Sequence, residues 1–172
     1  MTGQINVNKI AARTGNTITV DSGDKISGNV THGTGSVFPA GHVIQTVNNT
    51  STSTVSTSST TAQALISASI SPKFTNSVIH VDGYVSRFQL GYGSSNAYGT
   101  ITMLDPSDNT LGLGVGGSAI ANSMPVALHA VHSPNSTSSL TYELRISAAS
   151  GGTGTVSTDG QRYSLKLTEV AV

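Results

Sequence analysis

The stretch "ASISPKFTNSVIHVDG", residues 68–83, decides how the rest of the chain is interpreted. Apolar and small polar residues alternate up to Pro72, which lacks the backbone N–H that a strand ladder needs and so favours the end of a strand. A tight polar turn follows, and a second alternating segment runs on as "SVIHVDGYVSRFQL" to Leu90. The sequence therefore predicts two β-strands joined by a short turn.

The second of these strands carries apolar residues on both of its faces, which a purely antiparallel sheet does not normally need. Two explanations are open. A β-bulge at Asp82-Gly83 would shift the alternation of the side chains. Alternatively, the strand is covered on one face by its own sandwich and on the other by a neighbouring subunit. In that case the candidates for a trimer-interface strand are Tyr84, Phe88 and Leu90.

The composition favours the second explanation. Only 9% of the residues are charged, and 8 basic side chains balance 8 acidic ones. Such a chain has no basic surface that would predict nucleic-acid binding or attraction to an anionic membrane. Charge repulsion between copies is also close to zero, which promotes association. We therefore expect an oligomer, and the default is closed cyclic symmetry; we take it to be a homotrimer.

The sequence has no cysteine, so disulfides and thiolate metal sites are excluded. No basic and then apolar leader opens the chain, and no run approaches the ~18 apolar residues of a membrane helix. We expect a protein that is made in a cytoplasm, is not exported by a cleaved signal and does not insert into a membrane.

Residues 1–38 are predicted to form an N-terminal arm or stalk, and residues 39–172 a separate head domain. The arm holds short alternating pieces such as "INVNKI" and "TITV", with too few aliphatic residues for a core of its own. A disordered tail and an arm that is ordered by a partner or by sister chains both fit this pattern.

From residue 42 onward, about eight alternating segments are separated by turn-forming residues, and no segment keeps a 3.6-residue period. The predicted fold is therefore all-β, a jelly-roll β-sandwich. Between residues 50 and 61, serine and threonine fill all positions but one, which predicts an exposed strand or loop.

Two motifs suggest chemistry that the surrounding residues do not support. "GLGVGG", residues 112–117, matches a dinucleotide-binding pattern, but Pro125 follows where that pattern requires a helix. Its glycines are instead expected to allow a bend or close backbone packing. His129 and His132 are three residues apart, which on a strand puts them on opposite faces, so they cannot bind one metal together.

No pair of carboxylates and no serine motif marks a catalytic site, so we predict no enzymatic activity, no cofactor and no metal. Exposed aromatic residues often mediate recognition. Tyr92, Asn96 and Tyr98 in and beside the Gly/Ser/Asn loop are therefore the candidates for a ligand-facing tip. The alternative is that one or both tyrosines pack into the sandwich.

Four segments carry a resemblance to a known family: "FPAGHVIQTVN", the Ser/Thr tract, "ASISPKFTNSVIHVDGYV" and the closing "SLKLTEVAV". Together they resemble fibre and appendage proteins of bacteriophages that infect marine bacteria and cyanobacteria. The first region, "INVNKIAARTGNTITVDSGDKISG", is similar to the stalk or anchor pieces of the same proteins. The segment "KFTNSVIHV" departs from the family, which has a Ser-rich turn and a lysine there.

The resemblance implies a trimeric head similar to the tumour necrosis factor jelly roll, carried on an N-terminal shaft or virion anchor. Three functions follow for testing. The first is a short tail or head fibre that contacts a host surface polysaccharide or protein and joins other virion proteins through residues 1–38. The second is a capsid decoration protein, or cement, that stabilises the shell. The third is a free carbohydrate-binding module.

Overall fold

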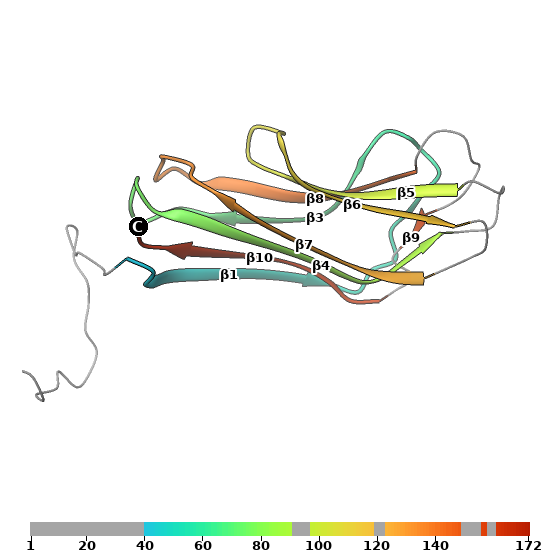
Figure 1. The fold of residues 1–172 in the computed structure, drawn as a ribbon, viewed down its shortest axis with the longest axis horizontal. Coiled ribbons are helices and arrows are strands. Elements are labelled where there is room, and N and C mark those ends of the chain that lie inside the picture. The colour runs from blue at the N-terminus through green and yellow to red at the C-terminus, as the bar shows by residue number, and fades with distance from the viewer. Residues whose placement is uncertain (1–39, 91–96, 119–122, 149–155, 158–160) are drawn as a thin grey trace, which may run out of the picture. The chain divides into compact units, whose positions relative to one another are not determined.

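The computed structural model describes residues 40–90, 97–118, 123–148, 156–157 and 161–172 (Figure 1). These residues form strands and no helix, and therefore no helix among them could cross a membrane. The predicted arm and its boundary with the head domain lie outside this part of the chain.

Ten strands make up the described head, and their bounds follow in chain order. They are β1 Val43–Ser51, β2 Ser56–Thr57, β3 Gln63–Ile70, β4 Val78–Leu90, β5 Ala97–Leu104, β6 Thr110–Ser118, β7 Ser123–His132, β8 Leu140–Ala148, β9 Val156–Ser157 and β10 Tyr163–Val170.

The strands form two antiparallel sheets with the topology of a jelly roll. In the first sheet β1 pairs with β10, β10 with β4, and β4 with β7 on its other side. The two-residue strands β2 and β9 pair with each other, and β9 also pairs with the end of β4. The second sheet has the order β3-β8-β5-β6. The chain crosses repeatedly from one sheet to the other and stays within one sheet only from β1 to β2, from β5 to β6 and from β9 to β10. The two layers form the predicted jelly-roll sandwich (Figure 1).

The core lies between the sheets and follows the alternation of the sequence. Along β10 every second side chain is buried, and along β8 Tyr142, Leu144 and Ile146 point inward with no exposed surface. The same period places the inward residues of β5 beside them in the same sheet and those of β4 in the facing sheet.

The two-faced appearance of β4 has a local cause. The strand does contain an irregularity, but it lies between Val85 and Phe88 and not at Asp82-Gly83. Residues 86 and 87 lie opposite the single residue Pro125 of β7, so β4 has one extra residue there and the side-chain parity changes. Both Val85 and Phe88 are therefore buried in the same core. Much of the apolar pattern of this strand is therefore used by the chain itself.

The glycines of β6 allow two strands of opposite sheets to approach each other. A Cβ atom built on Gly114 would lie 2.5 Å from Cγ1 of Val126 in β7, and one on Gly83 would lie 2.8 Å from Cδ2 of Leu144. Neither distance can be accommodated without a shift of the neighbour. The expectation that the glycines of "GLGVGG" serve close packing is confirmed at Gly114.

The described part of the head has two ends, which we call the arm end and the loop end. The arm end carries Ala40, where the described chain begins, the turn of residues 71–77, and the C-terminus (Figure 1). There the Gly41 N–H donates to the Ala171 carbonyl at 2.8 Å and the Ala171 N–H donates to the His42 carbonyl at 2.9 Å. At the opposite end, the loop end, β4, β6 and β8 finish and the chain continues into residues 91–96, 119–122 and 149–155.

Candidate interaction surfaces

A buried carboxylate organises the arm end. Glu169 in β10 is fully buried, on the core face of its strand. Its Oε1 accepts the backbone N–H of Lys73 at 2.7 Å and that of Phe74 at 3.3 Å, and the Ser77 hydroxyl lies 2.6 Å away. Its Oε2 accepts the side-chain amide of Gln45 at 2.6 Å. We call these five residues the Glu169 network. A buried carboxylate with this many donors is satisfied, whereas an unpaired one would be costly.

The Glu169 network joins three segments that are far apart in the sequence. Gln45 comes from "PAGHVIQ", the turn residues come from "SISPKFTNS", and Glu169 comes from "LTEV". Gln45 Nε2 also donates to the Ser71 carbonyl at 2.7 Å, and Asn49 Nδ2 donates to the Ser67 carbonyl at 2.7 Å. The side chains of β1 therefore hold the edge of β3 and fix the point at which the chain enters the head.

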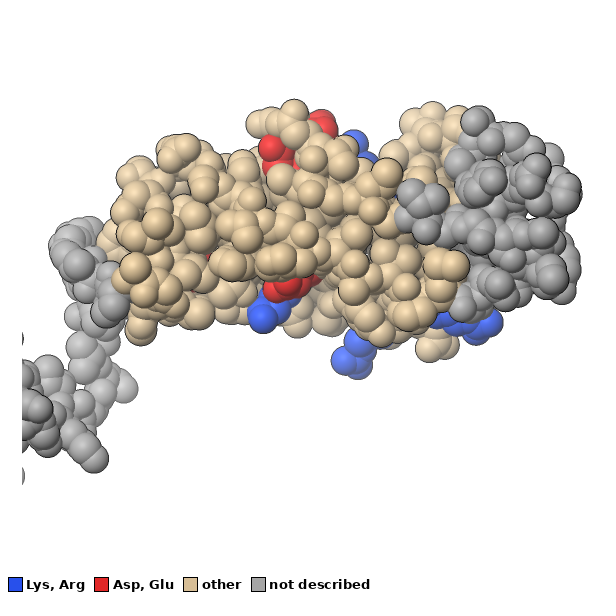
Figure 2. Space-filling model, in the orientation of Figure 1, with Lys and Arg blue, Asp and Glu red and all other residues tan. Residues whose placement is uncertain are grey.

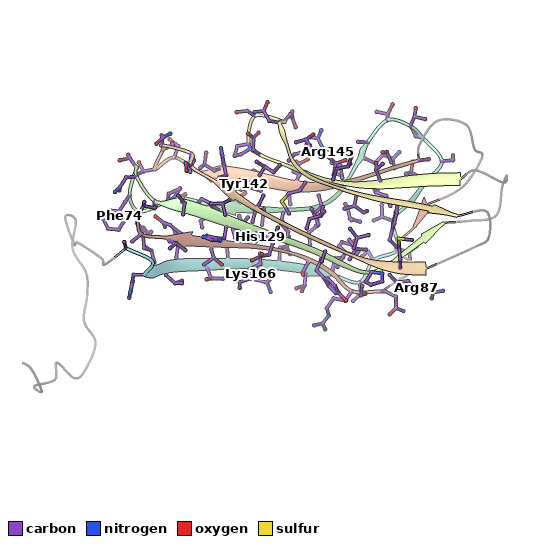
Figure 3. All side chains as sticks on the ribbon, viewed as in Figure 1. Phe74, Arg87, His129, Tyr142, Arg145 and Lys166 are labelled. Atoms are coloured by element: carbon purple, nitrogen blue, oxygen red, sulfur yellow. The ribbon has the colours of Figure 1, made fainter. Side chains whose placement is uncertain are left out.

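The outer face of the first sheet is a mixed polar and apolar surface. Its central residues are His80, Asp82 and Tyr84 of β4, Ala127, His129 and Val131 of β7, and Lys166 of β10. Nδ1 of His129 lies 2.7 Å from Oδ1 of Asp82, and the rings of His80 and His129 have centroids 5.5 Å apart. Val131 and Tyr84 are 52% and 45% exposed. Figure 3 labels His129 and Lys166 on this sheet.

The three interface candidates of β4 lie in different surroundings. Tyr84 is on the outer face of the first sheet, where a partner could reach it. Phe88 has no exposed surface and belongs to the core of its own chain, because the bulge at residues 86 and 87 turns it inward. It is therefore not part of the outer face. Leu90 pairs with Val156 through the backbone, and its side chain lies outside the described part of the chain.

Of the three loop-tip candidates, one lies within the described part of the chain. Tyr92 and Asn96 lie outside the described residues. Tyr98 belongs to β5, where its backbone pairs with Gly117 of β6, while its side chain is outside the description.

His129 and His132 lie on opposite faces of β7, as predicted. His132 points inward, and its Nδ1 is 2.9 Å from the hydroxyl of the buried Tyr142. Burial, and secondarily the charge of Asp105, raises the pKa of Tyr142 far above its ordinary value, so the phenol keeps its proton and can donate it to Nδ1. Nε2 of His132 then faces Oδ2 of Asp105 at 4.0 Å. These contacts connect the turn of residues 105–109 to the buried Tyr142 in the core.

The Asp105 carboxylate accepts hydrogen bonds from other residues of its own turn. Burial raises the pKa of Asp105, but hydrogen bonds from the Asn109 side chain and from the backbone N–H groups of Asn109 and Ser107 outweigh burial and hold it below the ordinary 3.8. The two N–H groups donate to Oδ1 at 2.9 and 2.8 Å. Asp108, with a φ of 63°, pairs with Arg145 at 2.7 Å.

Charged groups are sparse on the surface, and the view in Figure 2 is dominated by uncharged residues. Arg145 contacts Glu143 at 2.8 Å as well as Asp108, on the outer face of the second sheet. Within the described ranges, no group of three or more His, Asp or Glu side chains is placed to hold a metal ion together.

Comparisons with known proteins find no match among protein-family models or among curated proteins. Solved structures with some likeness include the VP2 subviral particle of infectious bursal disease virus, at 17% identity and a TM-score of 0.35 over 76% of this chain and 39% of that one. Particles derived from the same virus match at 13% identity and a TM-score of 0.34, over 76% and 37%. A Bacillus endospore appendage pilus protein matches at 12% identity and a TM-score of 0.27, over 80% and 97%. This chain spans about two fifths of the length of the viral chains that it matches.

Proposed function

We propose that this protein is a non-enzymatic structural protein of a bacteriophage virion, a short tail or head fibre whose trimeric head contacts the host surface. The observation that carries the proposal is the division of the head into two ends. The arm end is tightly bonded through the Glu169 network, and the loop end carries the connections that follow β4, β6 and β8. A protein that is anchored by one end and presents the other has this organisation.

Two further observations support the proposal. Three of the four segments that carry the resemblance to phage fibre proteins contribute residues to the Glu169 network; the Ser/Thr tract does not. The sparse surface charge also favours association of copies, since like charges do not keep them apart. The outer face of the first sheet, with Tyr84 and Val131 exposed, offers a surface for it.

Electron micrographs of virions that carry this protein, labelled with antibody against residues 40–172, test the proposal. We expect label on a tail or head appendage, at a copy number far below that of the shell subunits. Label spread over the shell, at a copy number close to that of the shell subunits, would instead assign the decoration role. Absence from purified particles would refute a virion role.

The oligomeric state is tested separately. Light scattering of the full chain at micromolar concentration should report about 52 kDa, three times the chain mass of 17.5 kDa. A stable monomer would contradict the proposed trimer. Replacing Tyr92 and Tyr98 by alanine should weaken adsorption to the host for a fibre tip and leave it unchanged for a decoration protein.

A further inference from the structure

Two histidines from neighbouring strands lie side by side on the outer face of the first sheet. His80 of β4 is paired in register with Val131 of β7, and Asp82 is paired with His129. His80 and His129 are therefore diagonal neighbours on the same face, and their ring centroids are 5.5 Å apart with the ring planes tilted by 39°. The rigid ladder between β4 and β7 sets this spacing.

The spacing suits two ligands of one metal ion. With nitrogen–metal distances of about 2.0–2.1 Å in tetrahedral geometry, the centroids of two imidazole ligands lie roughly 5 Å apart. The observed separation of 5.5 Å is close to this value.

Asp82 orients the His129 ring so that one of its nitrogens can bind a metal ion. Its Oδ1 lies 2.7 Å from Nδ1 of His129, so that Nδ1 carries the proton and Nε2 is left as the nitrogen available to a metal. The same carboxylate adds negative charge beside the rings. Lys166 faces Asp82 from β10 and adds a positive charge that would repel a bound cation. Because these groups are exposed, solvent screens this repulsion.

We propose that His80 and His129 bind one divalent transition-metal ion per chain, of the Zn²⁺, Ni²⁺ or Cu²⁺ class that imidazole prefers. Asp82 orients His129, and water fills the remaining positions, because the described residues place no third ligand there. The site does not depend on host attachment and lies on β4 and β7, away from both ends of the head. It shares the outer face of the first sheet with Tyr84 and Val131, the candidate surface for association of copies.

Calorimetric titration of the full, untagged chain with ZnCl₂ tests the site. We expect saturation at one ion per chain at a pH of about 7.5, and weaker binding at a pH of about 5.5, because protons compete for the imidazole nitrogens. His80→Ala and His129→Ala should each abolish saturable binding. Asp82→Asn should weaken it about tenfold, which is the usual effect of losing a partner that orients a metal ligand.

The matched control is His42→Ala, which removes a histidine at the arm end and should leave the titration unchanged. Melting curves show whether each variant is folded, and His80→Asn and His129→Asn replace any alanine variant that is not. The proposal is overturned if the unaltered chain shows no saturable binding, or if the variants at His80 and His129 bind Zn²⁺ as tightly as it does.

Discussion

At the scale of single residues, one buried carboxylate contributes most to the definition of the arm end. Glu169 occupies a core position in the alternation of β10, where an aliphatic residue would be ordinary. Its burial is tolerated because four groups hydrogen-bond to it. The sequence contained a signal for this, namely a charged residue on the apolar face of a strand. Its partners were not predictable, because they come from β1 and from a turn nearly a hundred residues away.

The first prediction concerns this carboxylate. Glu169→Gln should lower the free energy of unfolding by about 1–3 kcal/mol. The NH₂ group of the new glutamine would either face the Gln45 donor or leave one of the other buried donors without an acceptor. Urea denaturation measures the loss. Glu143→Gln is the control, since Glu143 is partly exposed and solvent screens its ion pair with Arg145, so the loss of stability should be smaller than for Glu169→Gln. Equal losses in the two variants would show that the network is unimportant.

The second prediction follows from Asp105. Its pKa is lower in the folded chain than the ordinary 3.8, so its ionised form stabilises the fold. This contribution is complete above the ordinary value and disappears as the pH falls below it, through the folded pKa. The stability difference between the unaltered protein and Asp105→Asn should therefore be constant above a pH of about 5 and shrink in stronger acid. A difference that grows on acidification would contradict this assignment.

The faces of individual residues were predictable, but their neighbours were not. The period of a strand is enough to place His129 and His132 on opposite faces. The contact of His129 with His80 depends on the register between β4 and β7, which the sequence of neither strand specifies. The same limit applies to His132 and Tyr142, which meet across the sandwich.

At the scale of elements, the strands and the fold class were predictable from alternation and turn residues, while irregularities within strands were not. A bulge in β4 could be inferred from its changing parity. Its position at residues 86 and 87 depends on the pairing of β4 with β7, and it decides that Phe88 joins the core. Glycine spacing in β6 suggested close packing, but only the structure identifies Val126 as the neighbour.

The third prediction tests this close approach. Gly114→Ala should destabilise the fold by about 1–3 kcal/mol, because its Cβ would overlap Cγ1 of Val126. Gly112→Ala, two residues earlier on the same strand, is the control: its Cβ would find its nearest atom at 3.8 Å, an ordinary contact. The combination of Gly114→Ala with Val126→Ala should cost less than the sum of the two single changes. Additive losses would show that the two residues do not compete for space.

At the scale of the whole molecule, the buried hydrophobic side chains among the described residues lie within residues 65–167. The fourth prediction is that a chain beginning at Val37 keeps its β-type circular dichroism and its melting temperature. A fragment of residues 1–38 should remain unfolded, since its few aliphatic residues cannot offset an ordering cost of roughly 1–2 kcal/mol per residue. Aggregation of the shortened chain would place the boundary elsewhere.

The pairing of β1 with β10 has a mechanical consequence. The chain enters β1 at the arm end, and the rows of hydrogen bonds to β10 run perpendicular to both strands. A pull on Ala40, resisted at the loop end, would act along the strand axis and load these bonds all at once in shear. It would not peel them apart one by one, so the head is expected to resist traction best in the direction from its entry point toward its loops.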